Sequence, residues 1–275
     1  MPHSPTMDKG FPDYENPPVI EVVCGILFKP LTAFLSPYIG LLWEKYKSGY
    51  PQCSEVAPLD PMIERFDEPP HMMLEIGSIP PLPRIWFLQE QGHGIIQVQR
   101  DRFLHNWRKV NPKDEYPRYR VVKQMFMENL SKFQAFLDEN KLGSIEPLQY
   151  EMTYVNHIPQ GEGWENLGDI GHVLPDFAFA AKKNRFVPEP NTVNWRTTFV
   201  LPEKAARMHM VVRNVRQRET GRLILLLELT VRGIGKDKSL EGMSKWFDLA
   251  RQWIVCGFAD LTSHEVQEKI WKRKR

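Results

Sequence analysis

The composition of this 275-residue chain excludes several broad classes of protein. Hydrophobic residues make up 42% of the sequence and charged residues 25%, so the chain can bury a sizeable core and is not expected to be disordered throughout. The 36 lysines and arginines nearly balance the 34 aspartates and glutamates. The resulting net charge of +2 gives no general attraction to nucleic acid or to a membrane surface, so any such binding must come from a local patch.

Targeting and redox signals are also missing from the sequence. No run of about 18 apolar residues occurs, and the polar, proline-rich residues 1–18 lack the apolar stretch of a secretion signal, so we expect a cytoplasmic protein with no membrane partner. Cys24, Cys53 and Cys256 lie far apart and form no C-x-x-C pair. The cysteines therefore indicate neither a disulfide framework nor a zinc cluster.

The first elements in chain order are a leader, a strand and a helix. Proline and glycine punctuate residues 1–16, which offer little to bury and predict a flexible leader ahead of the fold. Val19 to Phe28 is rich in β-branched and apolar residues and predicts a buried strand. A helix is expected to open at Ser36, followed by a proline. The proline-rich residues 53–83 predict loop, apart from a short strand near residues 71–76.

A hairpin and a long helix are expected next. Residues 84–90 and 95–100 are two β-rich runs separated by the turn composition Gln-Gly-His-Gly. A helix then opens at Pro117, carries apolar residues at helical spacing and ends at Gly143.

The second half is predicted to repeat this order of elements. It consists of a strand at residues 148–158, a short and weak helix at 165–177, a hairpin of residues 207–215 with 222–232, and a helix capped by Ser239. A final helix is expected to open at Thr262, whose spacing to Glu265 fits a capping box.

This order of elements predicts an α+β fold made of two pseudo-repeated β-α-β-β-α units, with antiparallel sheets packed against helices. The units would span residues 17–143 and 144–275 and pack together, with Glu21 and Glu151 at equivalent positions. As an analogy of fold alone, the arrangement resembles the tandem modules of the GyrI-like and SOUL ligand-binding proteins, in which a small molecule sits between the halves.

The most unusual string in the sequence follows the first hairpin. Alternation places Gln97 and Gln99 on one face of a strand, and this polar row runs into a strand end. The strand end carries Asp101, Arg102, Asn106, Trp107 and Arg108. Hydrogen-bonding groups beside a flat aromatic side chain suit a planar or anionic ligand. The structural alternative is an Asp101–Arg102 pair that fixes a corner of the chain, with Trp107 packed beneath it.

A second polar cluster ends the first strand of the second half. Alternation puts Tyr154 and Asn156 on one face of this strand and His157 on the other. A ligand site between the halves would combine Tyr154 and Asn156 with Arg102 or Arg108. The alternative is a strand end held by ordinary hydrogen bonds.

Four ordered motifs carry a resemblance to a known family. They are Asn16-Pro17-Pro18-Val19-Ile20-Glu21-Val22-Val23, the Q-x-Q-x-D-R-F-x-x-N-W-R string at 97–108, Tyr116-Pro117-Arg118-Tyr119, and Thr153-Tyr154-Val155-Asn156-His157-Ile158. In these motifs the chain resembles a sporadically distributed prokaryotic family of unknown function, from about residue 16 onward. The resemblance implies an accessory gene rather than core metabolism, and it implies no activity or cofactor.

Motifs of common catalytic and metal sites do not occur. The eight histidines show no H-x-x-x-H or H-E-x-x-H spacing, so we predict no metal and no cofactor. Phosphate loops, dinucleotide fingerprints and the G-x-S-x-G elbow are missing too. Basic strings remain as a route to nucleic acid, although charged tails and hairpin tips are usually just solvated. They contain Lys182, Lys183, Arg185, Arg213, Arg216, Arg218 and the string Lys272 to Arg275.

The sequence therefore favours a binding protein without catalytic function. It would either sense a small ligand between its halves or recognise another protein in an accessory prokaryotic system. Two alternatives stay open. One is an enzyme with an unrecognised site near residues 97–108 that uses Asp101, Glu21 or His157 as acid or base. The other is a nucleic-acid-binding accessory protein.

Overall fold

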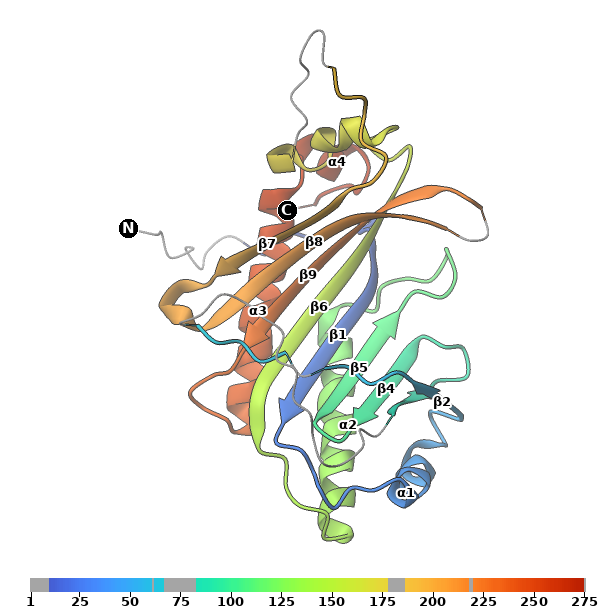
Figure 1. Cartoon of the computed structure of the whole chain (residues 1–275), viewed down its shortest axis with the longest axis vertical. Helices are drawn as coiled ribbons and strands as arrows, with labels where there is room; N and C mark the ends of the chain where they lie inside the picture. Colours follow the sequence, from blue (N-terminus) through green and yellow to red (C-terminus); the bar gives the residue numbers. More distant parts are fainter. Residues whose placement is uncertain (1–9, 61, 67–82, 178–185, 218–219, 275) are drawn as a thin grey trace.

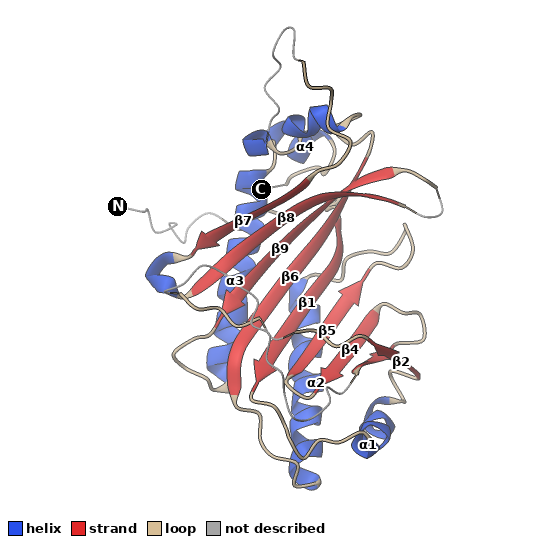
Figure 2. Ribbon diagram, viewed as in Figure 1, coloured by secondary structure: helices blue, strands red, loops and turns tan. Residues whose placement is uncertain are grey.

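The protein is an α+β molecule built on one antiparallel sheet (Figure 1). The computed structural model describes residues 10–60, 62–66, 83–177, 186–217 and 220–274. Within these ranges the sheet has nine strands in the order β2-β3-β4-β5-β1-β6-β9-β8-β7, and Figure 2 shows α2 and α3 side by side on one of its faces. None of the helices in the described part of the chain is both long and apolar enough to span a membrane.

The elements of the first half end with a long helix. They are β1 (Val19–Phe28), α1 (Pro37–Tyr46), β2 (Gln52–Val56), β3 (Arg84–Leu88), β4 (Gly94–Gln99), β5 (Arg102–Arg108) and α2 (Tyr119–Glu139). The second half contains β6 (Pro147–Pro159), the 3-10 helices η1 (Leu167–His172) and η2 (Pro175–Phe177), β7 (Asn194–Val200), the 3-10 helix η3 (Pro202–Lys204), β8 (Ala206–Arg216), β9 (Leu223–Gly233), α3 (Leu240–Leu261) and α4 (His264–Lys269).

Most of the predicted elements are confirmed. Strands β1 and β6, helices α1, α2 and α3, and the antiparallel pairs β3–β4 and β8–β9 lie where the sequence predicts them. Three strands were not predicted: β2 and β7 at the sheet edges, and β5, whose residues we expected to form a strand end. The expected strand near residues 71–76 lies outside the described residues.

Two local predictions need correction. Residues 165–177 contain 3-10 helices rather than an α-helix. The last helix is capped by Ser263, whose hydroxyl accepts a hydrogen bond from the Val266 amide at 3.3 Å, whereas Thr262 ends α3. The cap lies one residue later than predicted because the Thr262 hydroxyl donates to the Phe258 carbonyl of the preceding helix.

The two expected sheets are one continuous sheet, joined by the antiparallel pairing of β1 with β6. Helix α2 packs on β1 and β5, and α3 packs on β6 and β9. The predicted β-α-β-β-α order needs correction, because four strands lie between α1 and α2, and the described residues between β6 and α3 contain no α-helix. The duplication itself stays a prediction. It is favoured by matching cross-strand partners, since Glu21 of β1 lies opposite Arg108 and Glu151 of β6 lies opposite Arg232.

The face of the sheet under α2 and α3 is the apolar core. Helix α2 buries Val122, Phe126 and Phe133 at helical spacing, and α3 presents Phe247 to the Phe126 ring with 5.0 Å between the ring centroids. Each fully buried side chain of this size contributes about 1.5–3 kcal/mol through the hydrophobic effect. The apolar stripes of α2 and α3 therefore hold both helices on the same face of the sheet.

The opposite face of the sheet is polar and is crossed by residues 57–66, of which residue 61 is not described (Figure 1). Gln99 exchanges two 3.0 Å hydrogen bonds with the backbone of Leu59. Further along, the Glu64 carboxylate accepts hydrogen bonds from Arg207 at 3.0 Å and from His209. The crossing segment thus ties strands from both halves together.

Residues 10–16, part of the predicted leader, pack against the end of the chain. The Tyr14 ring is buried, and its hydroxyl donates to Gln267 at 3.1 Å. The amides of Glu15 and Asn16 donate to the carbonyls of Lys272 and Trp271, both at 3.1 Å. A segment with few apolar residues is ordered here because its backbone hydrogen bonds are satisfied by the residues after α4. Residues 1–9 lie outside the described part.

Candidate functional site

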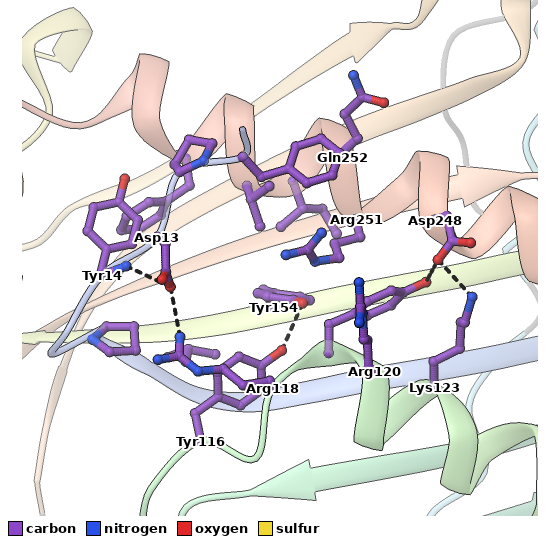
Figure 3. Close-up of a pocket in the computed structure, with 18 of the residues that line it drawn as sticks. Asp13, Tyr14, Tyr116, Arg118, Arg120, Lys123, Tyr154, Asp248, Arg251 and Gln252 are labelled. Atoms are coloured by element: carbon purple, nitrogen blue, oxygen red, sulfur yellow. Dashed lines mark hydrogen bonds and ion pairs between the residues drawn. The ribbon is translucent and has the colours of Figure 1, made fainter. Parts of the chain in front are cut away.

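A pocket of about 1180 Å³ opens beside α3, on the side of the sheet that carries the helices (Figure 3). Its walls come from residues 10–19, from residues 116–123 at the start of α2, from β6, and from residues 245–258 of α3. The pocket therefore draws on both halves of the chain. Its volume is above the range of roughly 300–1000 Å³ that is typical of small-molecule sites.

Strand alternation brings two predicted residues to this pocket. Tyr154 and Asn156 lie two positions apart in β6, so both face the helices, and both line the pocket. The prediction that they share a face is confirmed. Tyr154 lies opposite Val22 in the sheet, and Val22 in turn lies opposite Trp107, so these three residues form one row under the helices.

The turn before α2 supplies the opposite wall. Arg118 has a φ of 74°, a left-handed conformation that residues other than glycine rarely adopt. Its guanidinium forms an ion pair with Asp13 at 2.9 Å, which connects the start of α2 to residues 10–16 (Figure 3). A strained backbone conformation costs about 1–3 kcal/mol and persists only where surrounding contacts hold it. Such residues are frequent at binding sites.

Arg251 is the central basic residue of the pocket and reaches from α3 toward Tyr154 (Figure 3). Its guanidinium carbon lies 4.9 Å from the centroid of the Phe11 ring and 5.2 Å from that of the Tyr119 ring. Both distances are within the range of cation–π contacts. Within the described ranges, no carboxylate lies at ion-pair distance from Arg251, and its buried Nε has no hydrogen-bond partner.

Two tyrosine hydroxyls meet beside this arginine. The hydroxyls of Tyr116 and Tyr154 lie 2.9 Å apart and share a hydrogen bond. Burial raises the pKa of Tyr154, and the hydrogen bond with Tyr116 and the charge of Arg251 only partly oppose this shift. Burial likewise raises the pKa of Tyr116. Both hydroxyls therefore keep their protons at neutral pH.

Two other basic side chains of the pocket have carboxylate partners. Lys123 binds Asp248 at 2.7 Å, and the same carboxylate oxygen accepts a 2.8 Å hydrogen bond from the Tyr119 hydroxyl. Arg118 is paired with Asp13, as described above. These pairs fix the walls, whereas Arg251 has no carboxylate partner among the described residues and interacts with the Tyr154 hydroxyl.

The residues of the 97–108 string do not join Tyr154 and Asn156. Arg102, Asn106 and Arg108 alternate with Trp107 along β5, so they face the polar side of the sheet while Trp107 faces the helices. The combined site of Tyr154 and Asn156 with Arg102 or Arg108 is therefore not formed. Trp107 instead packs against Tyr116, with 5.2 Å between the ring centroids.

On the polar side, Gln97 and Asn106 of the string belong to a hydrogen-bonded network. The Gln97 side chain accepts from Arg84 and Trp86 and donates to Asn106 at 2.7 Å. Asn106 then donates to the Glu21 carboxylate at 2.6 Å. Burial raises the pKa of Glu21, against the opposing effects of Asn106 and Arg108.

At the start of β5, Asp101 and Arg102 form the corner that the structural alternative describes. Two nitrogens of Arg102 donate to the two carboxylate oxygens of Asp101, both at 3.2 Å, and the Arg102 side chain is buried. A bidentate pair of this kind holds the turn between β4 and β5.

Of the remaining basic candidates, only some lie in the part of the chain that the structure describes. Arg213 and Arg216 are exposed on the β8–β9 hairpin, and the Arg273 side chain donates to Gln267 at 2.7 Å. The other basic candidates Lys182, Lys183, Arg185, Arg218 and Arg275 lie outside the described residues. In the part of the chain that the structure describes, histidine, cysteine, aspartate and glutamate form no group of three that could hold a metal ion.

Sequence reasoning missed Arg251, Phe11 and Tyr119 as pocket residues. Tyr116, Arg118 and Tyr119 belong to a motif that carries the family resemblance, which was the one available signal. Comparisons with models of protein families, with curated proteins and with solved structures find no match to this chain.

Proposed function

We propose that this chain is a non-catalytic binding protein that takes up a small ligand in the pocket beside α3. The observation that carries the proposal is Arg251, a half-buried guanidinium with an unpartnered Nε in a pocket lined by both halves. A guanidinium carries five N–H donors, so the part of the half-buried Arg251 side chain that faces the pocket can donate hydrogen bonds to a bound molecule.

The position of the pocket fits a sensing role. Its walls include residues 10–16, α2 and α3, which belong to distant parts of the sequence, so a ligand would contact all of them at once. Any molecule that binds the folded state alone also stabilises it by mass action. The proposed accessory role in a prokaryotic system rests on the family resemblance.

The acid–base alternative has less support from the geometry. Asp101, Glu21 and His157 do not line this pocket. Asp101 is held by Arg102, and Glu21 is hydrogen-bonded to Asn106 on the opposite face of the sheet. A catalytic acid or base has to lie within hydrogen-bond reach of its substrate.

The test is native mass spectrometry of the full chain purified from its own host, together with a variant that fills the pocket. Leu249 lines the pocket and is 38% exposed, so Leu249→Trp adds volume there with little effect on the core. Leu240 lies on the same helix outside the pocket and is 61% exposed, so Leu240→Trp is the matched control.

We expect a non-covalent adduct on the native protein and on Leu240→Trp that disappears under denaturing conditions. Leu249→Trp should lose most of the adduct and melt at the temperature of the native protein from which the ligand has been removed. An adduct of equal occupancy on Leu249→Trp would show that the molecule binds elsewhere, and the proposal would then be wrong.

A further inference from the structure

We propose that the ligand of this pocket is an aromatic acid, an organic molecule in which one carboxylate or similar oxyanion is carried on a ring system, with Arg251 as its counter-ion. The inference rests on the proposed function and names the class of ligand. It follows from the charge of the pocket, from its hydrogen-bonding groups and from its apolar walls.

The charge of the pocket favours an anion. Among the described residues that line it, five are basic and two are acidic. The basic residues are Arg118, Arg120, Lys123, Lys245 and Arg251, and the acidic ones are Asp13 and Asp248. Both acidic residues are already paired, with Arg118 and Lys123. A bound anion would offset the remaining positive charge.

Arg251 is the basic residue that a buried anion would contact. Lys245 pairs with Glu241 on the outer surface of α3, and Arg120 is solvent-exposed. Exposed charges are screened by water and contribute little to binding. Arg251 is half-buried between two aromatic rings, where an ion pair is screened less.

The polar groups around Arg251 donate hydrogen bonds. A guanidinium carries five N–H donors and no acceptor. The Tyr116–Tyr154 hydrogen bond uses one of the two hydroxyl protons, which leaves the other proton to donate. A ligand group that meets these donors has to supply acceptors only, as a carboxylate does.

The walls around these donors are apolar and aromatic. The Phe11 and Tyr119 rings lie within cation–π distance of the guanidinium, and Leu249, Val255 and Phe258 continue the wall along α3. Such a wall gains free energy from contact with a ring system through the hydrophobic effect and ring packing. An inorganic anion would leave this surface uncovered.

The closing experiment uses two fluorescent probes of similar shape and different charge. 1-Anilinonaphthalene-8-sulfonate is an aromatic anion, and N-phenyl-1-naphthylamine is its neutral counterpart. We expect the full chain to bind the anion in the pocket, with competition by sodium benzoate and no competition by inorganic phosphate at equal ionic strength. Phosphate that competes as well as benzoate would overturn the aromatic part of the proposal.

Arg251→Met removes the counter-ion and keeps an apolar side chain of similar length. We expect the Kd of the anionic probe to rise at least about tenfold, equivalent to about 1.4 kcal/mol. Arg120→Met removes one exposed charge of the same pocket and should change that Kd by less than about threefold. The Kd of the neutral probe should be the same for the native protein and Arg251→Met, which also shows that the variant keeps its pocket.

The outcomes separate this inference from the proposed function. In one outcome, Leu249→Trp excludes the neutral probe, while Arg251→Met does not change the Kd of the anionic probe. The pocket then binds ligands, but the assignment of an acid is wrong. If Leu249→Trp excludes neither probe, the pocket does not bind them and both proposals fail.

Discussion

His105 shows how strongly one side chain can depend on its surroundings in this protein. The imidazole is fully buried under α2, and its Nε2 atom lies 3.2 Å from the Tyr50 hydroxyl. That hydroxyl also accepts a 3.1 Å hydrogen bond from the Asn129 side chain. Burial lowers the pKa of His105 to about 4, because the charged form would lose its hydration. The residue is therefore neutral in the folded protein.

This shift predicts a loss of stability in mild acid. The pKa of His105 is lower in the folded than in the unfolded chain, so the unfolded chain takes up the proton first as the pH falls. Above about pH 6.5 the neutral His105 contributes fully to the free energy of unfolding. This contribution, roughly 2–4 kcal/mol, is lost as the pH falls from about 6.5 to about 4. Urea unfolding at several pH values should show a shallower decline for His105→Gln than for the native protein.

The control for this measurement is His264→Gln, since the His264 side chain is 72% exposed. We expect its stability to follow the pH dependence of the native protein. A decline in His105→Gln as steep as that of the native protein would assign the acid sensitivity to other groups.

Single residues also show where prediction from sequence ends. Alternation placed Gln97 with Gln99, and Tyr154 with Asn156, because a strand has a fixed period of two. Arg251 could not be identified in this way. A lone arginine on an amphipathic helix normally faces water, and only the folded chain places Phe11 and Tyr119 around it.

At the scale of elements, residues 10–16 have the composition of a flexible segment, yet Tyr14 packs them against the rest of the fold. The Tyr14 ring contacts the rings of Phe258 and Trp271, with centroid distances of 5.7 and 6.3 Å. We predict that Tyr14→Ala lowers the free energy of unfolding by about 2–4 kcal/mol, as expected for the loss of a buried aromatic ring. Amide hydrogen exchange should then become faster at Asn16 and Lys274, which take part in the pairing of the two segments.

The matched variant for this segment is Tyr14→Phe. It keeps both ring contacts and removes the 3.1 Å hydrogen bond to Gln267, so its loss should be about 0.5–1.5 kcal/mol. Unchanged exchange at Asn16 in Tyr14→Ala would show that the backbone pairing alone holds the segment.

The three strands that the sequence did not predict lack the apolar alternation that identifies a strand. Strands β2 and β7 are edge strands with one neighbour each and many half-exposed or exposed side chains, so apolar alternation is weak. Strand β5 is buried on both faces, yet one face carries the polar side chains of Arg102 and Asn106. Its composition therefore resembles a polar loop. The helices α2 and α3 were predictable because their apolar stripes follow the helical period.

At the scale of the whole molecule, the sequence predicted the α+β class but neither the single sheet nor three of its strands. Whether two units share a sheet depends on the pairing of β1 with β6, which are separated by most of the first half. No local pattern encodes that contact. The pocket was unpredictable for the same reason, since its walls come from four separate stretches of the chain.

The prediction that the protein holds no transition metal also belongs to this scale. It rests on the spacing of histidines and cysteines along the sequence, which provides no chelating set. Elemental analysis of the full chain purified from its host should find less than stoichiometric zinc and iron. One equivalent of either metal per chain, retained through dialysis, would contradict the prediction.

The central position of β1 has a consequence for the way the chain folds. Its two neighbours in the sheet, β5 and β6, both follow it after long stretches of sequence. The backbone of β1 therefore cannot pair with either neighbour through local contacts. Folding rates fall as contacts span more of the chain, because loop closure costs entropy before the contact forms. We therefore expect slow refolding. While β6 is undocked, the apolar strand β1 would expose a row of unpaired backbone groups, which makes this intermediate the species most prone to aggregation.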